Sequence, residues 1–328
     1  MTTPHVIGIG NAIVDVIARA DDHFLEHMGI EKGIMQLVER ERAELLYASM
    51  GERTETPGGS VANTIAGLGK LGLQSSFIGK VKGDSLGRSY AEGMEADGIA
   101  FPNAPVADAP LPTSRSMIFV SPDGERSMNT YLGAGADLGA DDVPEAPFAK
   151  GGFVFLEGYL FDKDEGKTAF RRAAELMHRA GGEAGITLSD PFCTERHRED
   201  FKALIAGEMD VVIGNEKEWT TLYETDLDSA LGLAAEACRT VVCTRSGEAV
   251  VILKDGARVE VPVTRIVPVD ATGAGDQFAA GFLYGYVGGR DSETCGRMGV
   301  AAASEVISHI GPRPEADMMT RFRELGLV

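Results

Sequence analysis

The chain has 328 residues, of which 44% are hydrophobic, 25% charged and 7% aromatic, so it can bury a substantial core and is a globular protein, not a disordered one. Its 31 basic and 50 acidic side chains leave a net charge of −19 at pH 7. This charge repels phosphate backbones and anionic membranes, which argues against a nucleic-acid or membrane partner. An anionic substrate would need a locally positive pocket or an accompanying metal ion.

The cysteine pattern and the N-terminal sequence indicate the compartment. No Cys-x-x-Cys pair occurs, and a chain of this size does not need a disulfide framework. We therefore expect reduced, mostly buried thiols at Cys193, Cys238, Cys243 and Cys295. Residues 1–5 lack the basic and apolar regions of a signal peptide, and no run of 18 apolar residues occurs. These features predict a cytoplasmic protein.

Strand-like and helical patterns alternate along most of the chain. The first apolar run, 6–10, ends in glycine and suits a buried strand. Further strands are predicted at 76–78, 153–156, 185–188, 211–213, 241–244 and 249–253, and helices at 61–71, 90–97, 166–179 and 229–238. This alternation predicts an α/β fold in which a mostly parallel central sheet carries helices on both faces.

One region departs from this alternation. Residues 114–120 and 125–132 flank the turn-forming sequence Ser121-Pro122-Asp123-Gly124 and predict a β-hairpin. Two further strand-like segments, 14–18 and 34–38, can join it in a small second sheet. We therefore expect one unit over 1–328, with a discontinuous β lid at approximately 14–38 and 112–133 that covers the carboxyl edge of the main sheet, where α/β proteins bind ligands.

The segment 267–282 carries the clearest chemical signal. It reads as an apolar strand at 267–269, a glycine-containing loop and an Ala-rich helix. Gly273 and Gly275 would let peptide N–H groups converge on an anion at the helix N-terminus. Asp276, at the helix start, could accept a proton from a substrate hydroxyl beside a transferring phosphoryl group. Taken alone, the pattern equally suits a plain strand–helix turn with Asp276 as its cap.

Two other nucleotide-binding motifs do not fit this chain. The segment 270–276 lacks the Gly-Lys-Ser/Thr of a Walker A loop. Gly8-Ile9-Gly10-Asn11-Ala12-Ile13 begins like a dinucleotide fingerprint but has isoleucine at the third glycine position. A dehydrogenase is therefore disfavoured.

Four ordered motifs carry a resemblance to a known family. The sequence Asp270-Ala271-Thr272-Gly273-Ala274-Gly275-Asp276 resembles the signature of the PfkB, or ribokinase-like, small-molecule kinases. The segments 10–15 and 58–63 resemble the substrate motifs of that family, and Asn215-Glu216-Lys217-Glu218 fits its Asn-x-x-Glu motif. The resemblance covers almost the whole chain and implies a ribokinase-like fold with ATP-dependent phosphotransfer to an alcohol.

The resemblance assigns catalytic roles to the 273–276 turn. Asp276 is expected to be the catalytic base, and Gly273, Ala274 and Gly275 to donate backbone N–H groups to the γ-phosphoryl oxygens. These roles suit phosphoryl transfer, which depends on positioning and electrostatic stabilisation. Arg126 resembles a lid arginine of adenosine kinases and is expected to cover the transferring phosphate, the alternative being a surface arginine on an exposed hairpin.

Substrate contacts are expected mainly from the first two motifs. Asp15 can accept hydrogen bonds from two adjacent hydroxyls, and Asn11 and Asn63 can add amide contacts. Gly58 and Gly59 would let the ligand approach the main chain ahead of a helix near residue 60. By analogy with adenosine kinases, Ile13, Leu132 and Tyr159 are candidates for enclosing a purine base.

The residues that would bind the nucleotide are assigned by resemblance alone. Asn215 and Glu218 resemble the pair that organises Mg²⁺ around the nucleotide phosphates, through water and not by direct ligation. Thr244 and Gly247 resemble the contacts of the nucleotide loop of the family. ATP and Mg²⁺ are therefore implied, and some relatives also use K⁺ near the anion-binding turn.

Several alternatives stay open from the sequence. Segments 22–25, 29–37, 156–160 and 189–192 resemble adenosine kinases, which favours adenosine or a related nucleoside as substrate. Met35 and Gln36 depart from that pattern, so a sugar kinase for ribose or fructose is the main alternative. A non-catalytic nucleoside- or sugar-binding protein is a third, although binding alone would not need Asp276. The lid suits either a monomer or a homodimer.

Overall fold

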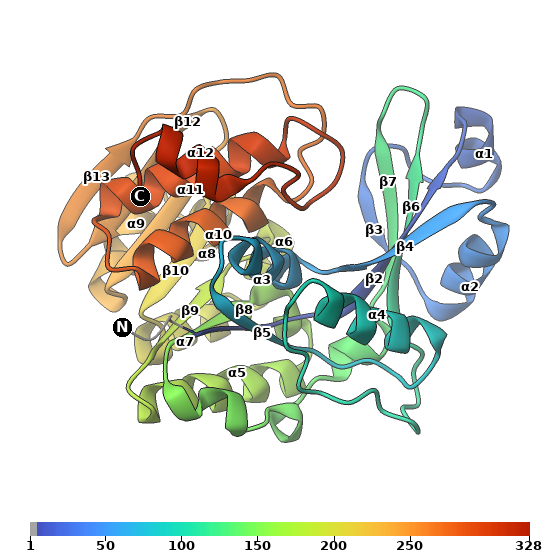
Figure 1. Ribbon diagram of the computed structural model, residues 1–328, viewed down its shortest axis with the longest axis horizontal. Coiled ribbons are helices and arrows are strands. Elements are labelled where there is room, and N and C mark those ends of the chain that lie inside the picture. Colours follow the sequence, from blue (N-terminus) through green and yellow to red (C-terminus); the bar gives the residue numbers. More distant parts are fainter. Residues whose placement is uncertain (1–4) are drawn as a thin grey trace.

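Strands and helices form two separate sheets in the computed structural model, which describes residues 5–328 (Figure 1). The larger sheet has the strand order β13-β12-β11-β10-β9-β8-β1-β5. Its strands are β1 (His5–Ile9), β5 (Gln74–Ile78), β8 (Phe153–Glu157), β9 (Glu183–Thr187), β10 (Val211–Asn215), β11 (Thr240–Arg245), β12 (Glu248–Lys254) and β13 (Ala257–Val261). All neighbours from β5 to β11 pair in parallel, and β12 and β13 add an antiparallel edge. The predicted mostly parallel sheet is confirmed.

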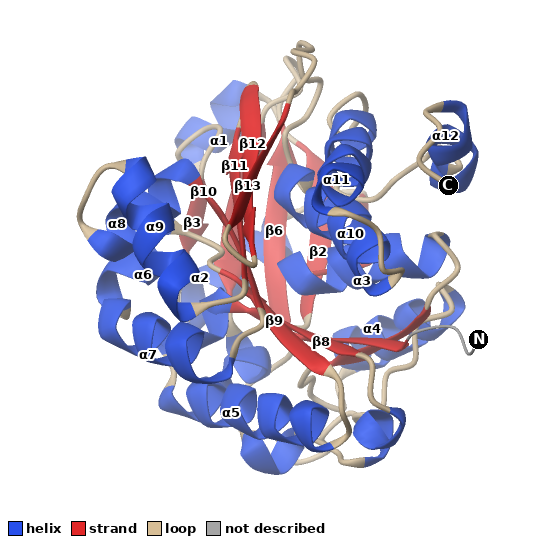
Figure 2. Cartoon of the chain, turned by 90° about the vertical axis from the view of Figure 1, so that its left-hand side faces the viewer, coloured by secondary structure: helices blue, strands red, loops and turns tan. Residues whose placement is uncertain are grey.

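Helices cover both faces of this sheet (Figure 2). One face carries α3 (Ser60–Lys70), α10 (Ala274–Val287) and α11 (Ser292–Val306), and the other carries α5 (Asp164–Arg179), α7 (Arg198–Glu208), α8 (Glu216–Tyr223) and α9 (Leu227–Ala237). The remaining α-helices outside the smaller sheet are α4 (Ser85–Ala96), α6 (Pro191–Arg196) and α12 (Met318–Glu324). Strand β8 shows why two layers are needed, because Phe153 and Phe155 enter one core while Val154 and Leu156 enter the other.

The smaller sheet, called the lid below, has the order β3-β7-β6-β2-β4. It consists of β2 (Ile13–Arg19), β3 (Met35–Leu37), β4 (Arg53–Gly58), β6 (Ser114–Val120) and β7 (Arg126–Tyr131), accompanied by α1 (Asp22–His27) and α2 (Arg40–Ser49). The predicted β6–β7 hairpin is present, with Arg126 opposite Val120. Strand β4 was not predicted, because an exposed edge strand with the sequence RTETPG lacks an apolar pattern.

The two faces of the lid differ in character. Along β2, Val14, Val16 and Ala18 are buried against the lid helices, while Asp15 lies on the opposite face. Strand pairing places Arg126 on the same face as Asp15, and the Arg126 guanidinium reaches Asp270 of the larger part at 2.8 Å. The face of the lid that carries Asp15 and Arg126 is therefore turned toward the larger part.

The structure corrects one expected strand. Residues 267–269 are not paired into either sheet, and Val267 and Val269 are 92% and 60% exposed. Pro268 has no N–H to donate to a ladder, and the Val269 N–H donates to the Ile307 carbonyl instead. The expected helix is confirmed, since α10 begins at Ala274.

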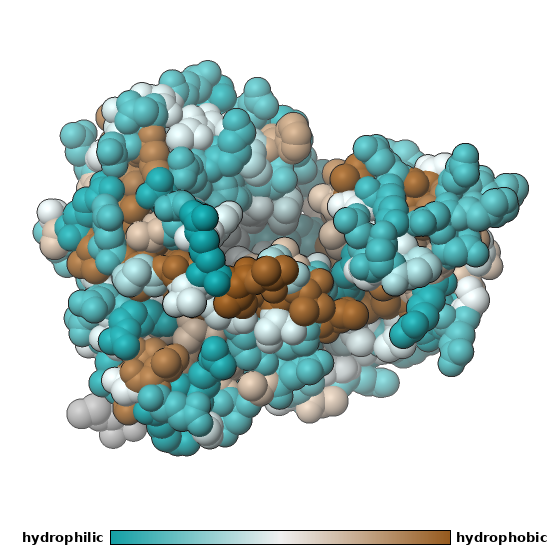
Figure 3. Space-filling view, turned by 90° about the horizontal axis from the view of Figure 1, so that it is seen from above, coloured by the Kyte–Doolittle hydropathy of each residue, from teal (hydrophilic) through white to brown (hydrophobic). Residues whose placement is uncertain are grey.

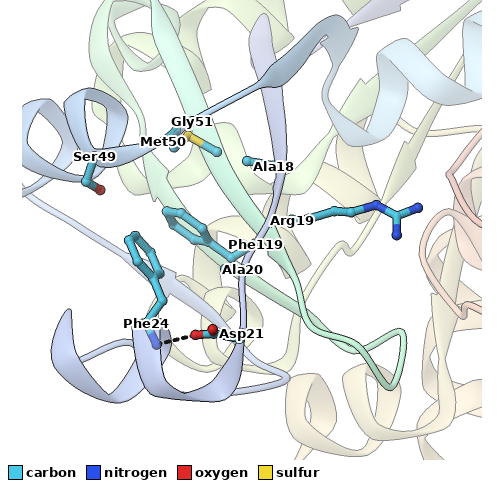
Figure 4. A pocket seen from close by; sticks show the side chains of 9 residues that line it. All are labelled: Ala18, Arg19, Ala20, Asp21, Phe24, Ser49, Met50, Gly51 and Phe119. Carbon is cyan, nitrogen blue, oxygen red and sulfur yellow. Dashed lines mark hydrogen bonds between the residues drawn. The ribbon is translucent and has the colours of Figure 1, made fainter.

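Two hollows border the lid. One, of about 990 Å³, lies between the lid and the larger part and includes Ile17, Thr54 and Ile310 in its lining. Figure 3 shows the molecule from above, with a depression between the two parts and apolar residues gathered beside it. The other, of about 290 Å³, lies beside α1, where Phe24, Met50 and Phe119 contribute to its lining (Figure 4).

The expectation about the cysteines can be checked against the described residues. All four cysteines are buried and unpaired, as predicted. Within residues 5–328, no helix combines the length and apolarity that crossing a membrane requires.

Candidate active site

The glycine turn before α10 leaves backbone donors free. Gly273 has φ +78°, and a β-carbon there would lie 2.6 Å from the Cα atom of Pro312, so this position excludes a side chain. Among the described residues, the N–H groups of Gly273, Gly275 and Asp276 have no hydrogen-bond acceptor, whereas the Ala274 N–H donates to the Ala271 carbonyl at 3.3 Å. These donors, at the positive end of a helix, fit an anion.

Asp276 is the third residue of α10 and is fixed by helix α3. The Ser60 hydroxyl donates to Oδ1 at 2.7 Å, and the Asn63 amide donates to Oδ2 at 3.1 Å. The Thr64 hydroxyl holds the Asp276 main chain, donating to its carbonyl at 3.1 Å. Burial raises the pKa of Asp276 to about 6, against the lowering effect of Ser60 and Asn63. At neutral pH the group is an oriented carboxylate that can accept a proton.

Asp15 supplies a second carboxylate, on the face of the lid that is turned toward the larger part. It has no hydrogen-bond donor among the described residues, and its carboxylate occupies the space that a side chain on Gly58 would need. Burial raises the pKa of Asp15 to about 6; Arg126 and Arg313 oppose this shift and Asp276 adds to it. Its oxygens are therefore available to hydroxyl groups of a ligand.

Gly59 is required for the approach of these two motifs. It has φ +107°, and a side chain there would collide with the carbonyl oxygen of Asn11. Helix α3 starts at the next residue, Ser60, as expected from the sequence. The structure therefore brings Gly58, Gly59 and Asn63 beside Asp15 and Asp276.

Glu157 is a buried acid that the sequence did not single out as a site residue. It ends β8, is 1% exposed, and accepts hydrogen bonds from the Asn11 N–H at 3.2 Å, the Asn11 amide at 2.9 Å and the Val61 N–H at 3.0 Å. Burial raises its pKa to about 7. Its signal was an acid directly after a buried strand, at the sheet edge where sites form.

The position of Asn11 follows from this contact. Its side chain is 2% exposed, its amide nitrogen is used by Glu157, and its Oδ1 has no hydrogen-bond partner in the described residues. The structure thus places Asn11 behind the cleft, where it orients Glu157, and the predicted amide contact with substrate stays a prediction.

Asn215 and Glu218 form a capping box at the start of α8. The Asn215 N–H and amide donate to the two Glu218 oxygens at 2.8 and 2.6 Å, and the Glu218 N–H donates back to Oδ1 at 2.9 Å. Burial raises the pKa of Glu218 to about 7. Direct ligation of Mg²⁺ would disrupt this box, so the pair fits water-mediated contact better. Within residues 5–328, no cluster of three or more His, Cys, Asp or Glu side chains has a metal-binding arrangement.

The expected nucleotide-loop residues follow the neighbouring strand. Thr244 pairs with Asn215 across β10 and β11, so these two residues are adjacent at the same sheet edge. The Gly247 carbonyl accepts a hydrogen bond from Arg265 at 3.1 Å. Its predicted contact with nucleotide would use the remaining main-chain surface of the β11–β12 turn.

Arg126 joins the lid to the 270–276 turn. Its side chain is 5% exposed and donates to Asp270 Oδ2 at 2.8 Å. Asp270 also accepts from the N–H groups of Thr272 and Gly311, each at 2.9 Å. Arg126 is thus a buried lid residue at the 270–276 turn, not an exposed hairpin arginine, and its charge is paired with Asp270.

The three candidate base contacts come from both sides of the cleft. Ile13 pairs with Ser114 across β2 and β6, and the Ser114 hydroxyl donates to the Leu132 carbonyl, so Ile13 and Leu132 both adjoin Ser114. Tyr159 follows β8 on the larger part, where burial and neighbouring carboxylates raise the pKa of its hydroxyl well above its ordinary value. All three side chains are partly buried.

Known proteins of similar sequence and structure include several small-molecule kinases. The chain is 44% identical to a probable sugar kinase from Rhizobium etli, with full coverage of both chains and a TM-score of 0.90. It is 46% identical to an adenosine kinase from Sinorhizobium meliloti, covering 99% of this chain and all of that one, with a TM-score of 0.89. A 5-dehydro-2-deoxygluconokinase from Lacticaseibacillus casei is 30% identical over 281 residues, covering 81% of this chain and 86% of that protein.

The family match spans nearly all of the elements described above. Residues 30–318 match the pfkB family of carbohydrate kinases, a range that includes β3 to β13 and the 270–276 turn. The ribokinase-like α/β fold is therefore confirmed, as is the resemblance on which it was predicted. The chain belongs to the pfkB family of ATP-dependent sugar and nucleoside kinases.

Proposed function

We propose that this kinase transfers the γ-phosphoryl group of Mg·ATP to the 5′-hydroxyl of adenosine or a closely related nucleoside. The observation that carries the proposal is the proximity of two carboxylates where the lid meets the larger part: Asp276, beside unpaired N–H groups, and Asp15, which has no donor among the described residues. The first suits proton removal next to an anion, and the second suits recognition of a diol.

Each residue would contribute a separate part of the reaction. Asp15 accepts from two ribose hydroxyls and orients the sugar, while Asp276 removes the proton of the attacking hydroxyl. The N–H groups of Gly273 and Gly275 stabilise charge on the transferring phosphoryl oxygens. Arg126 exchanges Asp270 for phosphate as the nucleotide binds, which keeps the lid closed and excludes water as a competing nucleophile.

The lid supports a nucleoside over a simple sugar. Strand pairing places Met35 and Leu37 on the same face as Asp15, where they are 41% and 55% exposed. Exposed apolar side chains on the same face of the lid as a polar diol-binding group, with two strands between them, match a molecule with a flat base and a sugar. The 46% identity to an adenosine kinase over nearly the full chain points the same way.

A sugar kinase is the second candidate. The names of the Rhizobium etli and Lacticaseibacillus casei proteins favour it. Asp15 and Asp276 could act on a sugar in the same way, so only the apolar side chains of the lid favour a nucleoside over a sugar.

ADP release by the purified protein with Mg·ATP decides between them. Adenosine, inosine, guanosine, ribose and fructose are tested at equal concentration. We expect adenosine or another nucleoside to give the highest kcat/KM. Turnover with a sugar alone would refute the nucleoside assignment, and silence with every acceptor would favour a binding-only role.

The same assay should show an acid limb in its pH profile. Asp276 and Asp15 have pKa values of about 6, and both must be ionised to act as proposed. We therefore expect kcat/KM to fall as the pH drops below about 6, by more than ten-fold per pH unit where both groups titrate together. A profile that stays flat down to pH 5 would contradict the ionised form of either carboxylate as the active one.

A further inference from the structure

The segment 311–316 connects several parts of the site. The segment follows α11, and hydrogen bonds to neighbouring elements fix it at both ends. The Gly311 N–H donates to Asp270 at 2.9 Å, and the Pro312 carbonyl accepts from Gln277 at 3.0 Å. At the other end, the N–H groups of Glu315 and Ala316 donate to buried Glu305 at 3.0 and 2.8 Å. The residue between these anchors, Arg313, therefore starts from a fixed backbone.

The Arg313 guanidinium contacts three different elements. Its Nε donates to Asn63 Oδ1 in α3 at 3.3 Å, and its Nη2 donates to the Pro57 carbonyl in β4 at 2.6 Å. Its Nη1 pairs with Asp97 at the end of α4. Only a planar group with divergent donors can make these contacts at once, and the side chain is 18% exposed.

The contact with Asn63 fixes which way its amide faces. The Asn63 side chain is 5% exposed, and its nitrogen must point to Asp276 to donate the 3.1 Å hydrogen bond. Its oxygen then needs a donor on the opposite side, which Arg313 supplies. A flipped amide would set oxygen against the Asp276 carboxylate and nitrogen against the guanidinium, two repulsive contacts.

The contact with Pro57 acts on the other carboxylate. Pro57 precedes Gly58, over which the Asp15 carboxylate lies, so Arg313 fixes the strand that borders Asp15. Its positive charge also opposes the rise in the pKa of Asp15 that burial causes. Arg313 lies outside the sequence motifs, but it contacts residues next to both Asp276 and Asp15.

We propose that Arg313 is a positioning residue of the active site, which orients the Asn63 amide toward Asp276 and fixes lid strand β4 at Pro57. The inference rests on the proposed role of Asp276 as the base. Arg313 would thus contribute to catalysis by holding other residues in place, and it need not contact the substrate.

Arg313→Met tests the proposal, with Asp97→Asn as the matched control because Asp97 touches Arg313 but neither carboxylate. We expect Arg313→Met to lower kcat by roughly ten-fold or more, as loss of one oriented hydrogen bond at a charged group implies. Its acid limb should move to higher pH, because Asp276 and Asp15 both lose stabilisation of their ionised forms. Asp97→Asn should leave kcat and the acid limb within about two-fold of wild type, as for a surface change.

A double-mutant cycle shows whether Arg313 acts through Asn63. In an Asn63→Ala background, adding Arg313→Met should change kcat by less than about two-fold, because the amide that it orients is gone. Arg313→Lys serves as a second variant if Arg313→Met does not fold, and should lose kcat similarly since an ammonium cannot span the three acceptors.

Three results would overturn the proposal: an unshifted acid limb with normal kcat in both Arg313 variants, equal losses in Arg313→Met and Asp97→Asn, or full additivity with Asn63→Ala. Asp276→Asn assayed alongside separates this from the proposed function. If Asp276→Asn is inactive while both Arg313 variants are normal, only the role of Arg313 fails; if Asp276→Asn is active, the assignment of the base fails.

Discussion

An Asp276→Asn enzyme is expected to lose at least about a hundred-fold in kcat, the lower range for removal of a general base. The amide has nearly the shape of the carboxylate, so the contact from the Ser60 hydroxyl at 2.7 Å can persist. It cannot accept the proton of the attacking hydroxyl. Because the N–H groups of the turn are unchanged, KM for Mg·ATP should change far less than kcat.

The measurement is steady-state ADP release over a range of both substrates. Asp291→Asn is the matched control, because Asp291 also stands at a helix start, where it caps α11, and asparagine caps as well as aspartate. That control should retain wild-type kcat. A folded Asp276→Asn enzyme with near-normal kcat would eliminate Asp276 as the base.

Replacement of Asp15 by alanine should act mainly on substrate affinity. Loss of a charge-assisted hydrogen bond costs about 1.5–3 kcal/mol, which corresponds to a rise in KM for the phosphoryl acceptor of about ten- to a hundred-fold. KM for ATP should stay near its wild-type value, since the unpaired donors of the 273–276 turn are unaffected.

Initial rates at varied acceptor concentration provide this comparison. Asp22→Ala is a suitable control, because Asp22 also belongs to the lid but has a side chain that is 70% exposed and paired with Lys32. An Asp15→Ala enzyme whose acceptor KM equals that of this control would show that Asp15 does not contact the substrate.

The sequence predicted those elements whose turn or cap residues lie within the element itself. The β6–β7 hairpin follows from its turn residues, and the start of α10 follows from Gly273, which adopts φ +78°. The failures have local causes too. Residues 267–269 have the composition of a strand but lack a neighbour to pair with, whereas the exposed edge strand β4 pairs without an apolar pattern.

Of the candidate site residues, the sequence identified those that lie within short motifs. Asp276 was a candidate because it follows Gly273 and Gly275 in a short signature, and Asp15 because it ends the 10–15 motif that begins at Gly10. Glu157 and Arg313 were not, since what qualifies them is a set of hydrogen bonds to residues up to 256 positions away. Such contacts arise from packing of the whole fold, and no local pattern encodes them.

The 311–316 segment also has a consequence for how the enzyme matures. The hydrogen bonds that orient Asp276 and Asn63 join residues 213, 216 and 250 positions apart, so each closes a loop that spans most of the chain. Contacts between residues so far apart form late in folding, because closing such a long loop costs entropy that other contacts must already offset. During biosynthesis, a chain that has emerged only as far as α11 already contains Asp276 but not Arg313. On the proposed roles of Asp276 and Arg313, the phosphotransfer centre is complete only after the 311–316 segment has packed against α3 and α10.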